Sequence, residues 1–146
     1  MQFHLPYIAL FFTIATSSIL DLLFRFLSFE GAPPTLLGLL VIVAGIALGF
    51  WGRHALTIHA TALSPYGTPT SLVTTGPFKF SRNPMYLSYV LVALGFAVIL
   101  WSPLAVVPPI VYFAYLDRIV VPREEIKLRK GFSEYGEYAK KIRKWL

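Results

Sequence analysis

The sequence predicts an all-α integral membrane protein with about four transmembrane helices. Of its 146 residues, 56% are hydrophobic and only 14% are charged, a composition too apolar for an ordinary soluble domain. The apolar residues gather in runs that each approach the ~20 residues needed to cross a bilayer. The four runs are Pro6–Leu23, Thr35–Trp51, Pro84–Trp101 and Leu104–Val121. No cysteine is present, which excludes disulfides, thiol nucleophiles and cysteine-based metal sites.

The first two runs are expected to form a pair of membrane helices. The first has no positive leader and no small-residue cleavage site, so we expect it to be retained and not removed as a signal peptide. Asp21 and Arg25 are four residues apart, which favours an ion pair near the interface. Gly45 and Gly49 have a spacing that lets helices approach closely. This spacing indicates packing within the monomer, with a homodimer through the two glycines as the alternative.

Residues 53–82 are expected to form an ordered loop, because prolines and glycines interrupt the apolar pattern. The loop carries Arg53, Lys79 and Arg82 and no acidic residue, which by the positive-inside rule places it in the cytoplasm. Four spans then put both termini in the cytoplasm. His54 and His59 are five residues apart with no carboxylate in the loop, so no metal site is expected.

The start of the third run is the expected place for chemistry. Asn83 is a suitable N-cap, and Pro84 suits the first helical position. Free backbone N–H groups would lie there beside Arg82 and Tyr86, a setting suited to an anionic or amphiphilic ligand. The helix would return through a tight hairpin at Ser102-Pro103.

Prolines and charges shape the rest of the chain. Pro108 and Pro109 are expected to interrupt the fourth span and either bend it or open its hydrogen-bond ladder. Pro122 is expected to start a helix that ends at Gly131, and Ser133 to cap a second one. In that second helix, aromatic and aliphatic residues share one face and basic residues the other, as in an interfacial amphipathic helix. The apolar face comprises Tyr135, Tyr138, Ile142 and Trp145, and the basic face Lys140, Lys141, Arg143 and Lys144.

The formal net charge of +6 is concentrated near the membrane. Nine of the thirteen Lys and Arg residues follow Asp117. We therefore interpret the charge as a determinant of topology and lipid contact, and expect no nucleic-acid partner.

Several of these motifs, in this order, resemble the C-terminal module of the isoprenylcysteine carboxyl methyltransferase and phospholipid methyltransferase superfamily. They are Leu72–Phe78, the Arg-x-Pro-x-Tyr of Arg82, Pro84 and Tyr86, the helical hairpin, the pair Glu124-Glu125, and Gly131-Phe132 with Tyr135 and Tyr138. The resemblance covers about residues 60–146. It divides the chain into an N-terminal transmembrane pair, residues 1–52, and a methyltransferase-like module, residues 53–146.

The resemblance implies a membrane methyltransferase that binds S-adenosylmethionine. The residues it implies at the cofactor are Val73, Gly76, Pro77, Phe78, Arg82, Asn83, Tyr86, Leu87, Glu124 and Glu125. One position departs from the eukaryotic members, which usually have histidine where this chain has Asn83. An amide does not titrate near neutral pH, so a role as a base is not expected there.

The acceptor is expected to be a lipophilic molecule taken from the membrane, with two chemical possibilities. A prenylated carboxylate would be oriented by Arg118 or Arg123, whereas a lipid amine would need Glu125 or a tyrosine to receive its proton.

Each motif alone also has a structural explanation, such as a helix cap or an interface anchor. Two other functions remain as alternatives: an NADPH-dependent enzyme resembling membrane sterol reductases, and a non-catalytic membrane interaction protein with the same fold.

Overall fold

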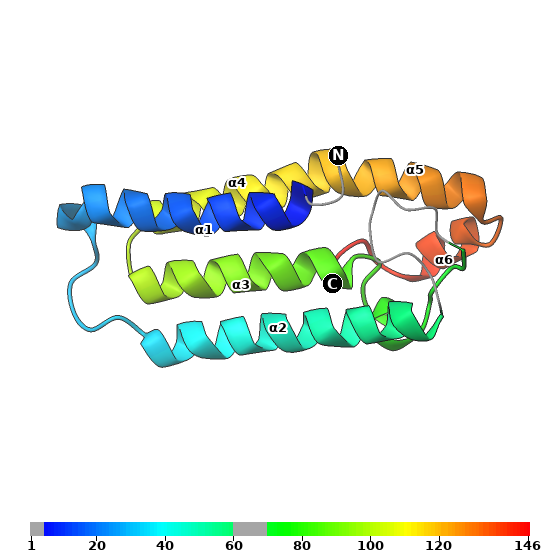
Figure 1. The fold of residues 1–146 in the computed structure, drawn as a ribbon, viewed down its shortest axis with the longest axis horizontal. Helices are drawn as coiled ribbons and strands as arrows, with labels where there is room; N and C mark the ends of the chain where they lie inside the picture. Colours follow the sequence, from blue (N-terminus) through cyan, green and yellow to red (C-terminus); the bar gives the residue numbers. More distant parts are fainter. Residues whose placement is uncertain (1–4, 60–69) are drawn as a thin grey trace.

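The computed structural model describes residues 5–59 and 70–146, in which every regular element is helical. The α-helices are α1 (Leu5–Leu23), α2 (Thr35–Ile58), α3 (Pro84–Leu100), α4 (Val107–Tyr115), α5 (Val121–Gly131) and α6 (Tyr135–Lys141). A π-helical segment, η4 (Leu116–Val120), joins α4 to α5, so the three form one rod (Figure 1). Short 3-10 turns are η1 (Arg25–Leu27), η2 (Gly76–Lys79) and η3 (Leu104–Val106).

The helices form the membrane bundle that composition predicts. Within the described ranges, three helical stretches are long and apolar enough to cross a bilayer, and α3 is a shorter apolar helix of 17 residues. Successive helices run in opposite directions, so the start of α1, the end of α2 and the start of α3 lie at one end with α5 and α6 (Figure 1). The all-α membrane fold is therefore confirmed, and the second span runs past Trp51 to Ile58.

Close packing of α2 on α3 uses the glycines of the second span. A Cβ atom added to Gly45 would lie 2.9 Å from the Ser88 carbonyl oxygen, and one added to Gly49 would lie 3.0 Å from Ser88 Oγ. Contacts this short show that the two glycines face α3 of the same chain. The homodimer through Gly45 and Gly49 is therefore not supported.

Helix α1 is held mainly by α3, α4 and η3. Ser17 Oγ donates to the Ala105 carbonyl at 3.0 Å, and Tyr112 donates to the Pro6 carbonyl at 2.9 Å. The expected Asp21–Arg25 ion pair is wrong, since the described residues form no such pair. Asp21 accepts a hydrogen bond from Ser28 at 3.3 Å.

The turn from α3 to α4 is the predicted tight hairpin. Trp101 adopts a left-handed conformation, with φ of 53°, and ends α3. Pro108 and Pro109, expected to bend the fourth span or open its hydrogen-bond ladder, follow the change from the 3-10 turn η3 to α4. They lie in the first turn of α4, where an α-helix has no N–H bonds to lose.

The predicted helix from Pro122 to Gly131 is confirmed to within one residue, since α5 spans Val121–Gly131. It continues the rod without a break at Pro122. The rod passes through it by widening one turn: the Val121 N–H donates to the Leu116 carbonyl, five residues back. The π-helical turn places the proline at the second position of α5, where its missing N–H is tolerated.

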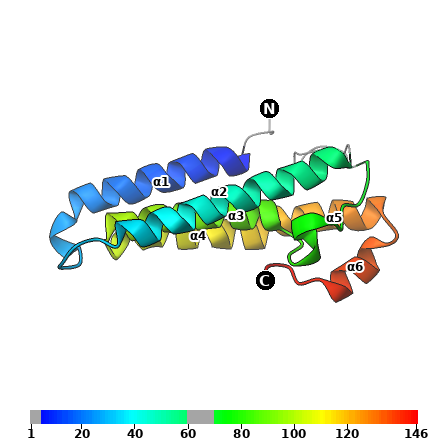
Figure 2. The same cartoon turned by 90° about the horizontal axis from the view of Figure 1, so that it is seen from below.

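The C-terminal helix is shorter than expected, and Glu134 precedes it in place of Ser133 as the cap. Helix α6 ends at Lys141, and Ile142 is extended. The last residues then turn back toward the start of α3 (Figure 2). A helical segment is confirmed, but an amphipathic helix continuing to Trp145 is wrong, because the backbone carbonyls there bond to other elements.

Candidate functional site

The start of α3 anchors a polar cluster at one end of the bundle. Asn83 occupies the N-cap position, and its carbonyl accepts the first helical bond from Leu87 at 3.0 Å. Its side chain does not cap the helix as predicted, because Nδ2 donates to the Lys144 carbonyl at 3.0 Å. The Asn83 backbone N–H instead donates to Ser81 Oγ at 3.1 Å.

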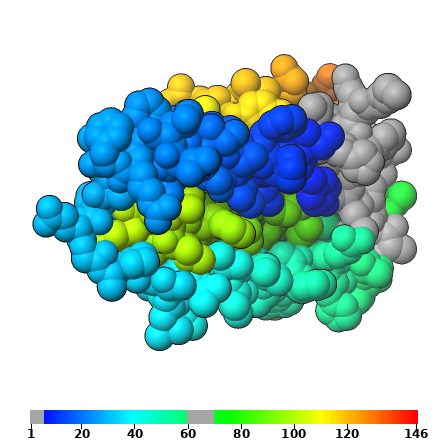
Figure 3. Space-filling model, turned by 60° about the vertical axis from the view of Figure 1, so that its left-hand side comes forward, coloured from blue at the N-terminus to red at the C-terminus, as the bar shows by residue number. Residues whose placement is uncertain are grey.

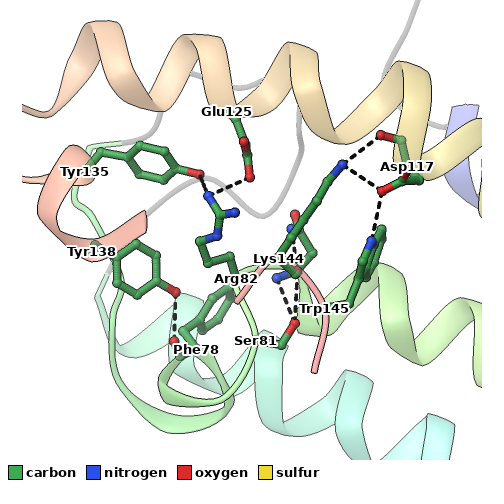
Figure 4. Close-up of polar contacts among 10 residues, drawn as sticks. Phe78, Ser81, Arg82, Asp117, Glu125, Tyr135, Tyr138, Lys144 and Trp145 are labelled. Carbon is green, nitrogen blue, oxygen red and sulfur yellow. Dashed lines mark hydrogen bonds and ion pairs between the residues drawn. The ribbon is translucent and has the colours of Figure 1, made fainter. Parts of the chain in front are cut away.

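Arg82 lies at the centre of this cluster (Figure 4). Its Nη1 is 2.9 Å from Glu125 Oε1 and donates to the Tyr135 hydroxyl at 3.4 Å. Burial is the main cause that raises the pKa of Tyr135 to about 12, with the nearby Glu125 charge acting in the same direction. Tyr135 is therefore a neutral hydroxyl at physiological pH, available to both charged partners.

The other glutamate of the pair faces a different partner. Tyr86 donates to Glu124 Oε2 at 2.8 Å, which joins α3 to α5. Tyr138 donates to the Phe78 carbonyl at 2.7 Å and so joins α6 to η2 (Figure 4). Burial raises the pKa of Tyr138 as well. Two pairs of elements that are distant in sequence, η2 with α3 and α5 with α6, thus meet around Arg82.

Two adjoining cavities open beside the cluster. The first is lined by Pro6, Tyr7, Leu56, Phe78, Arg82, Asn83, Pro84, Met85, Tyr86, Tyr89 and Glu124. The second is lined by Leu56, Ser71, Leu72, Val73, Phe78, Arg82, Asn83, Glu124, Glu125, Leu128, Tyr135 and Tyr138. Each measures about 70 Å³, below the ~300 Å³ at which pockets for drug-sized ligands begin. Both cavities are lined by Leu56, Phe78, Arg82, Asn83 and Glu124.

An apolar groove leads from the first cavity toward the lipid-facing surface. Helices α1 and α2 share no extensive contact, so α3 forms the floor between them (Figure 3). The groove measures about 320 Å³. Its lining comprises Tyr7, Leu10, Gly45, Ile46, Gly49, Phe50, Arg53, Met85, Ser88, Tyr89 and Val92. Tyr7, Met85 and Tyr89 also line the first cavity, so the two spaces adjoin each other.

Most of the residues expected at the cofactor line these cavities, and three do not. Gly76, with φ of +60°, lies against α2, where an added Cβ would be 3.3 Å from Ala55. Pro77 is buried and also approaches α2, at Gly52. Leu87 is half-buried one turn into α3. These residues are placed to shape the turn and the helix, while Val73 and Phe78 provide the wall.

The two arginines expected to orient an acceptor lie outside the cavities. The Arg118 side chain is 84% exposed, with its Nε 3.9 Å from Asp117. Arg123 is also exposed. Their proposed catalytic role stays a prediction, whereas Glu125 lines the second cavity beside Arg82.

Sequence reasoning missed three residues of the first cavity, two of them from the first two helices. Tyr7 from α1, Leu56 from α2 and Tyr89 from α3 all line the first cavity. Tyr89 follows Tyr86 by one helical turn, which is a detectable signal. Tyr7 and Leu56 have no comparable pattern, because only the packing of the bundle brings them to the site.

Comparison with known proteins gives a consistent result. A family model described as phospholipid methyltransferase matches residues 34–135. Two Oryza sativa proteins, from subspecies indica and japonica, are described as probable protein-S-isoprenylcysteine O-methyltransferase. Each is 30% identical over 122 residues, covering 80% of this chain and 59% of its own length. The cobalt-zinc-cadmium resistance protein CzcN of Cupriavidus metallidurans is 26% identical over 128 residues, or 88% of this chain and 57% of CzcN. No solved structure matches significantly.

Proposed function

Because the chain belongs to the phospholipid methyltransferase family, we propose that it transfers a methyl group from S-adenosylmethionine to a lipophilic acceptor at the cytosolic face of the membrane. The chain spans only 59% of the length of the Oryza relatives, so their activity is carried over as part of this proposal. The observation that supports it most directly is the convergence of Arg82, Tyr86, Glu124 and Glu125 on two adjoining cavities.

The donor set fits the polar groups of S-adenosylmethionine. Arg82 Nε is buried without a hydrogen-bond partner in the described part of the chain, so it is available to a ligand carboxylate. Glu124 and Glu125 offer carboxylates for an amino group or ribose hydroxyls. Phe78 and Tyr86 supply aromatic rings for a purine or a cation.

The chain's own contribution to methyl transfer is alignment and exclusion of water. S-adenosylmethionine, when bound, supplies an electrophilic methyl group on a positively charged sulfur. The cavity walls hold the reacting groups in line and keep competing water out, which are effects of position more than of proton transfer. Asn83 contributes no titrating group, which suits a reaction that depends on alignment.

The apolar groove supports a lipophilic acceptor. It is open to the lipid-facing surface between α1 and α2 and adjoins the first cavity at Tyr7 and Tyr89. An acceptor chain lying in it would reach the cavity without crossing water. Arg53 is the only charged residue among the described residues that line the groove, which favours an acceptor with an anionic group over a cationic one.

Calorimetric titration of the detergent-solubilised protein tests the donor. We expect binding heat with S-adenosylmethionine and none with NADPH. Heat with NADPH alone would favour the reductase alternative, and heat with neither would favour a non-catalytic protein. Membranes incubated with the methyl-labelled donor should then carry the label in the lipid extract, and label confined to the aqueous phase would contradict a lipophilic acceptor.

Matched variants test the site itself. Arg82→Ala and Glu124→Ala should each weaken S-adenosylmethionine binding by about tenfold or more, since each removes a charged contact. Lys79→Ala is the control, because Lys79 is an exposed cation three residues away that lines neither cavity. Helical circular dichroism verifies that each variant is folded. Equal affinity in all three variants would remove the proposed pocket.

A further inference from the structure

The last five residues, Ile142–Leu146, form what we term the C-terminal strap, which is hydrogen-bonded to the residues just before α3. The Arg82 backbone N–H donates to the Arg143 carbonyl at 3.0 Å. Asn83 Nδ2 and Ser81 Oγ donate to the Lys144 carbonyl at 3.0 and 3.3 Å. Three successive residues of the candidate site are therefore held by two carbonyls of the strap.

A second set of contacts fixes the strap to the long helical rod. Lys144 Nζ lies 2.7 Å from Asp117 Oδ1 and donates to the Asp117 carbonyl at 2.9 Å. Trp145 Nε1 donates to Asp117 Oδ1 at 2.9 Å (Figure 4). The Trp145 ring also packs against Phe113, with ring centroids 5.0 Å apart. Asp117 alone thus accepts from both Lys144 and Trp145 of the strap.

The π-helical turn explains why Asp117 can serve this role. In η4 the Val121 N–H donates to the carbonyl five residues back. In the same register the next donor, to Asp117, would come from residue 122, which is proline and has no N–H. The Asp117 carbonyl therefore has no backbone N–H donor in this register, and the Lys144 ammonium donates to it instead.

The strap lies outside the space that a ligand would occupy. None of its residues is among those that line the two cavities, although Arg82 and Asn83 line both. The Lys144 and Asp117 side chains are each 29% exposed, so the pair is partly shielded from water and salt. The strap is therefore placed to support the residues of the site and does not fill the cavities.

We propose that Asp117 and Lys144 are positioning residues for the cofactor site: by latching the strap to the rod they hold Arg82 and Asn83 in the geometry that binds S-adenosylmethionine. This inference rests on the proposed function and extends it to two residues that touch neither cavity. Displacing the strap would release the Arg82 backbone and the Asn83 amide, and small displacements of binding groups are costly.

The test compares Asp117→Asn and Lys144→Met with a control ion pair in the same tail. Lys140 Nζ lies 2.6 Å from Glu137, and both side chains are largely exposed, so Lys140→Met removes a pair expected to contribute little. Trp145 fluorescence, in a background with Trp51→Phe and Trp101→Phe, reports whether the strap is docked. Calorimetry gives the Kd for S-adenosylmethionine, and circular dichroism gives the melting temperature without ligand.

We expect both latch variants to raise the Kd by about tenfold, to change Trp145 emission, and to remain folded, while the control changes none of these. The double variant should bind no more weakly than the weaker single variant, because the two residues act through one contact. A chain ending at Lys141 removes the strap outright and should match the double variant.

Two outcomes would distinguish failure of the positioning role from failure of the proposed function. If the parent chain binds S-adenosylmethionine and the chain ending at Lys141 binds equally well, the strap has no positioning role, even if its loss lowers the melting temperature. If the parent chain binds none, the proposed function fails, and this inference fails with it.

Discussion

At the start of α3, a tyrosine reaches a carboxylate 38 residues further along the chain. Tyr86 is 6% exposed, and its hydroxyl donates to Glu124 at 2.8 Å. The Tyr86 ring also meets the Tyr89 ring edge to face, with centroids 6.3 Å apart. One residue therefore orients a glutamate of the second cavity and supports the wall of the first.

Replacing Tyr86 by phenylalanine tests this coupling. Tyr86→Phe keeps the ring but removes the donor to Glu124, so we expect a loss of about 1–3 kcal/mol in the free energy of unfolding. Tyr115→Phe in α4 is the control, because the Tyr115 hydroxyl has no hydrogen-bond partner among the described residues. Its removal should cost less than about 0.5 kcal/mol. Thermal unfolding in detergent measures both, and equal melting temperatures would contradict the assigned bond.

At the scale of elements, α2 and α3 approach each other along glycines on both helices. Gly38 and Gly95 face each other: a Cβ added to Gly95 would lie 2.7 Å from the Gly38 carbonyl oxygen and 2.6 Å from Ile42. The glycine spacing in the sequence indicated a close helix contact but not its partner. Only the packing shows that α3 of the same chain fills that position.

Adding one methyl group at this contact should separate the helices. Gly95→Ala forces backbone or side-chain shifts, and we expect it to cost about 1–3 kcal/mol. Gly136→Ala is the matched control, because Gly136 lies inside α6 with nothing within 4 Å of an added Cβ. That change should be stabilising by about 0.5–1 kcal/mol. Chemical or thermal unfolding of both variants compares them, and a neutral Gly95→Ala would contradict the close approach.

At the scale of the whole molecule, the site lies at a single end of the bundle. The start of α3, α5 and α6 all lie there, and the link between α1 and α2 lies at the opposite end (Figures 1 and 2). The positive-inside rule predicts that the site end faces the cytoplasm. Because all elements of the site lie at one end, one measurement of which end faces the cytoplasm places the whole site.

The absence of cysteine makes the orientation directly measurable. Ser133→Cys lies at the site end and Ala32→Cys in the opposite link, and both positions are exposed. A membrane-impermeant maleimide should label Ala32→Cys in intact cells and Ser133→Cys only after permeabilisation. The reverse pattern would show that the site faces away from the cytoplasm.

The sequence by itself determined the membrane class, the approximate helices and the family, because these depend on local composition and on short motifs. Apolar run length decides whether a segment enters the bilayer, whatever its neighbours are. Arg82, Tyr86 and the two glutamates were identifiable from their motifs before any contact was known. Asn83 was placed correctly at a helix start, yet its side chain bonds to the strap.

Only the tertiary structure decided which groups meet. The pairs Arg82–Glu125 and Asp117–Lys144 join residues far apart in the chain, and no local pattern encodes such contacts. The same holds for the tail. The hydrophobic period favoured a helix to Trp145, but the tail is extended after Lys141 and hydrogen-bonds to Ser81, Arg82 and Asn83. Local preference gives way there because the backbone carbonyls find partners on another element.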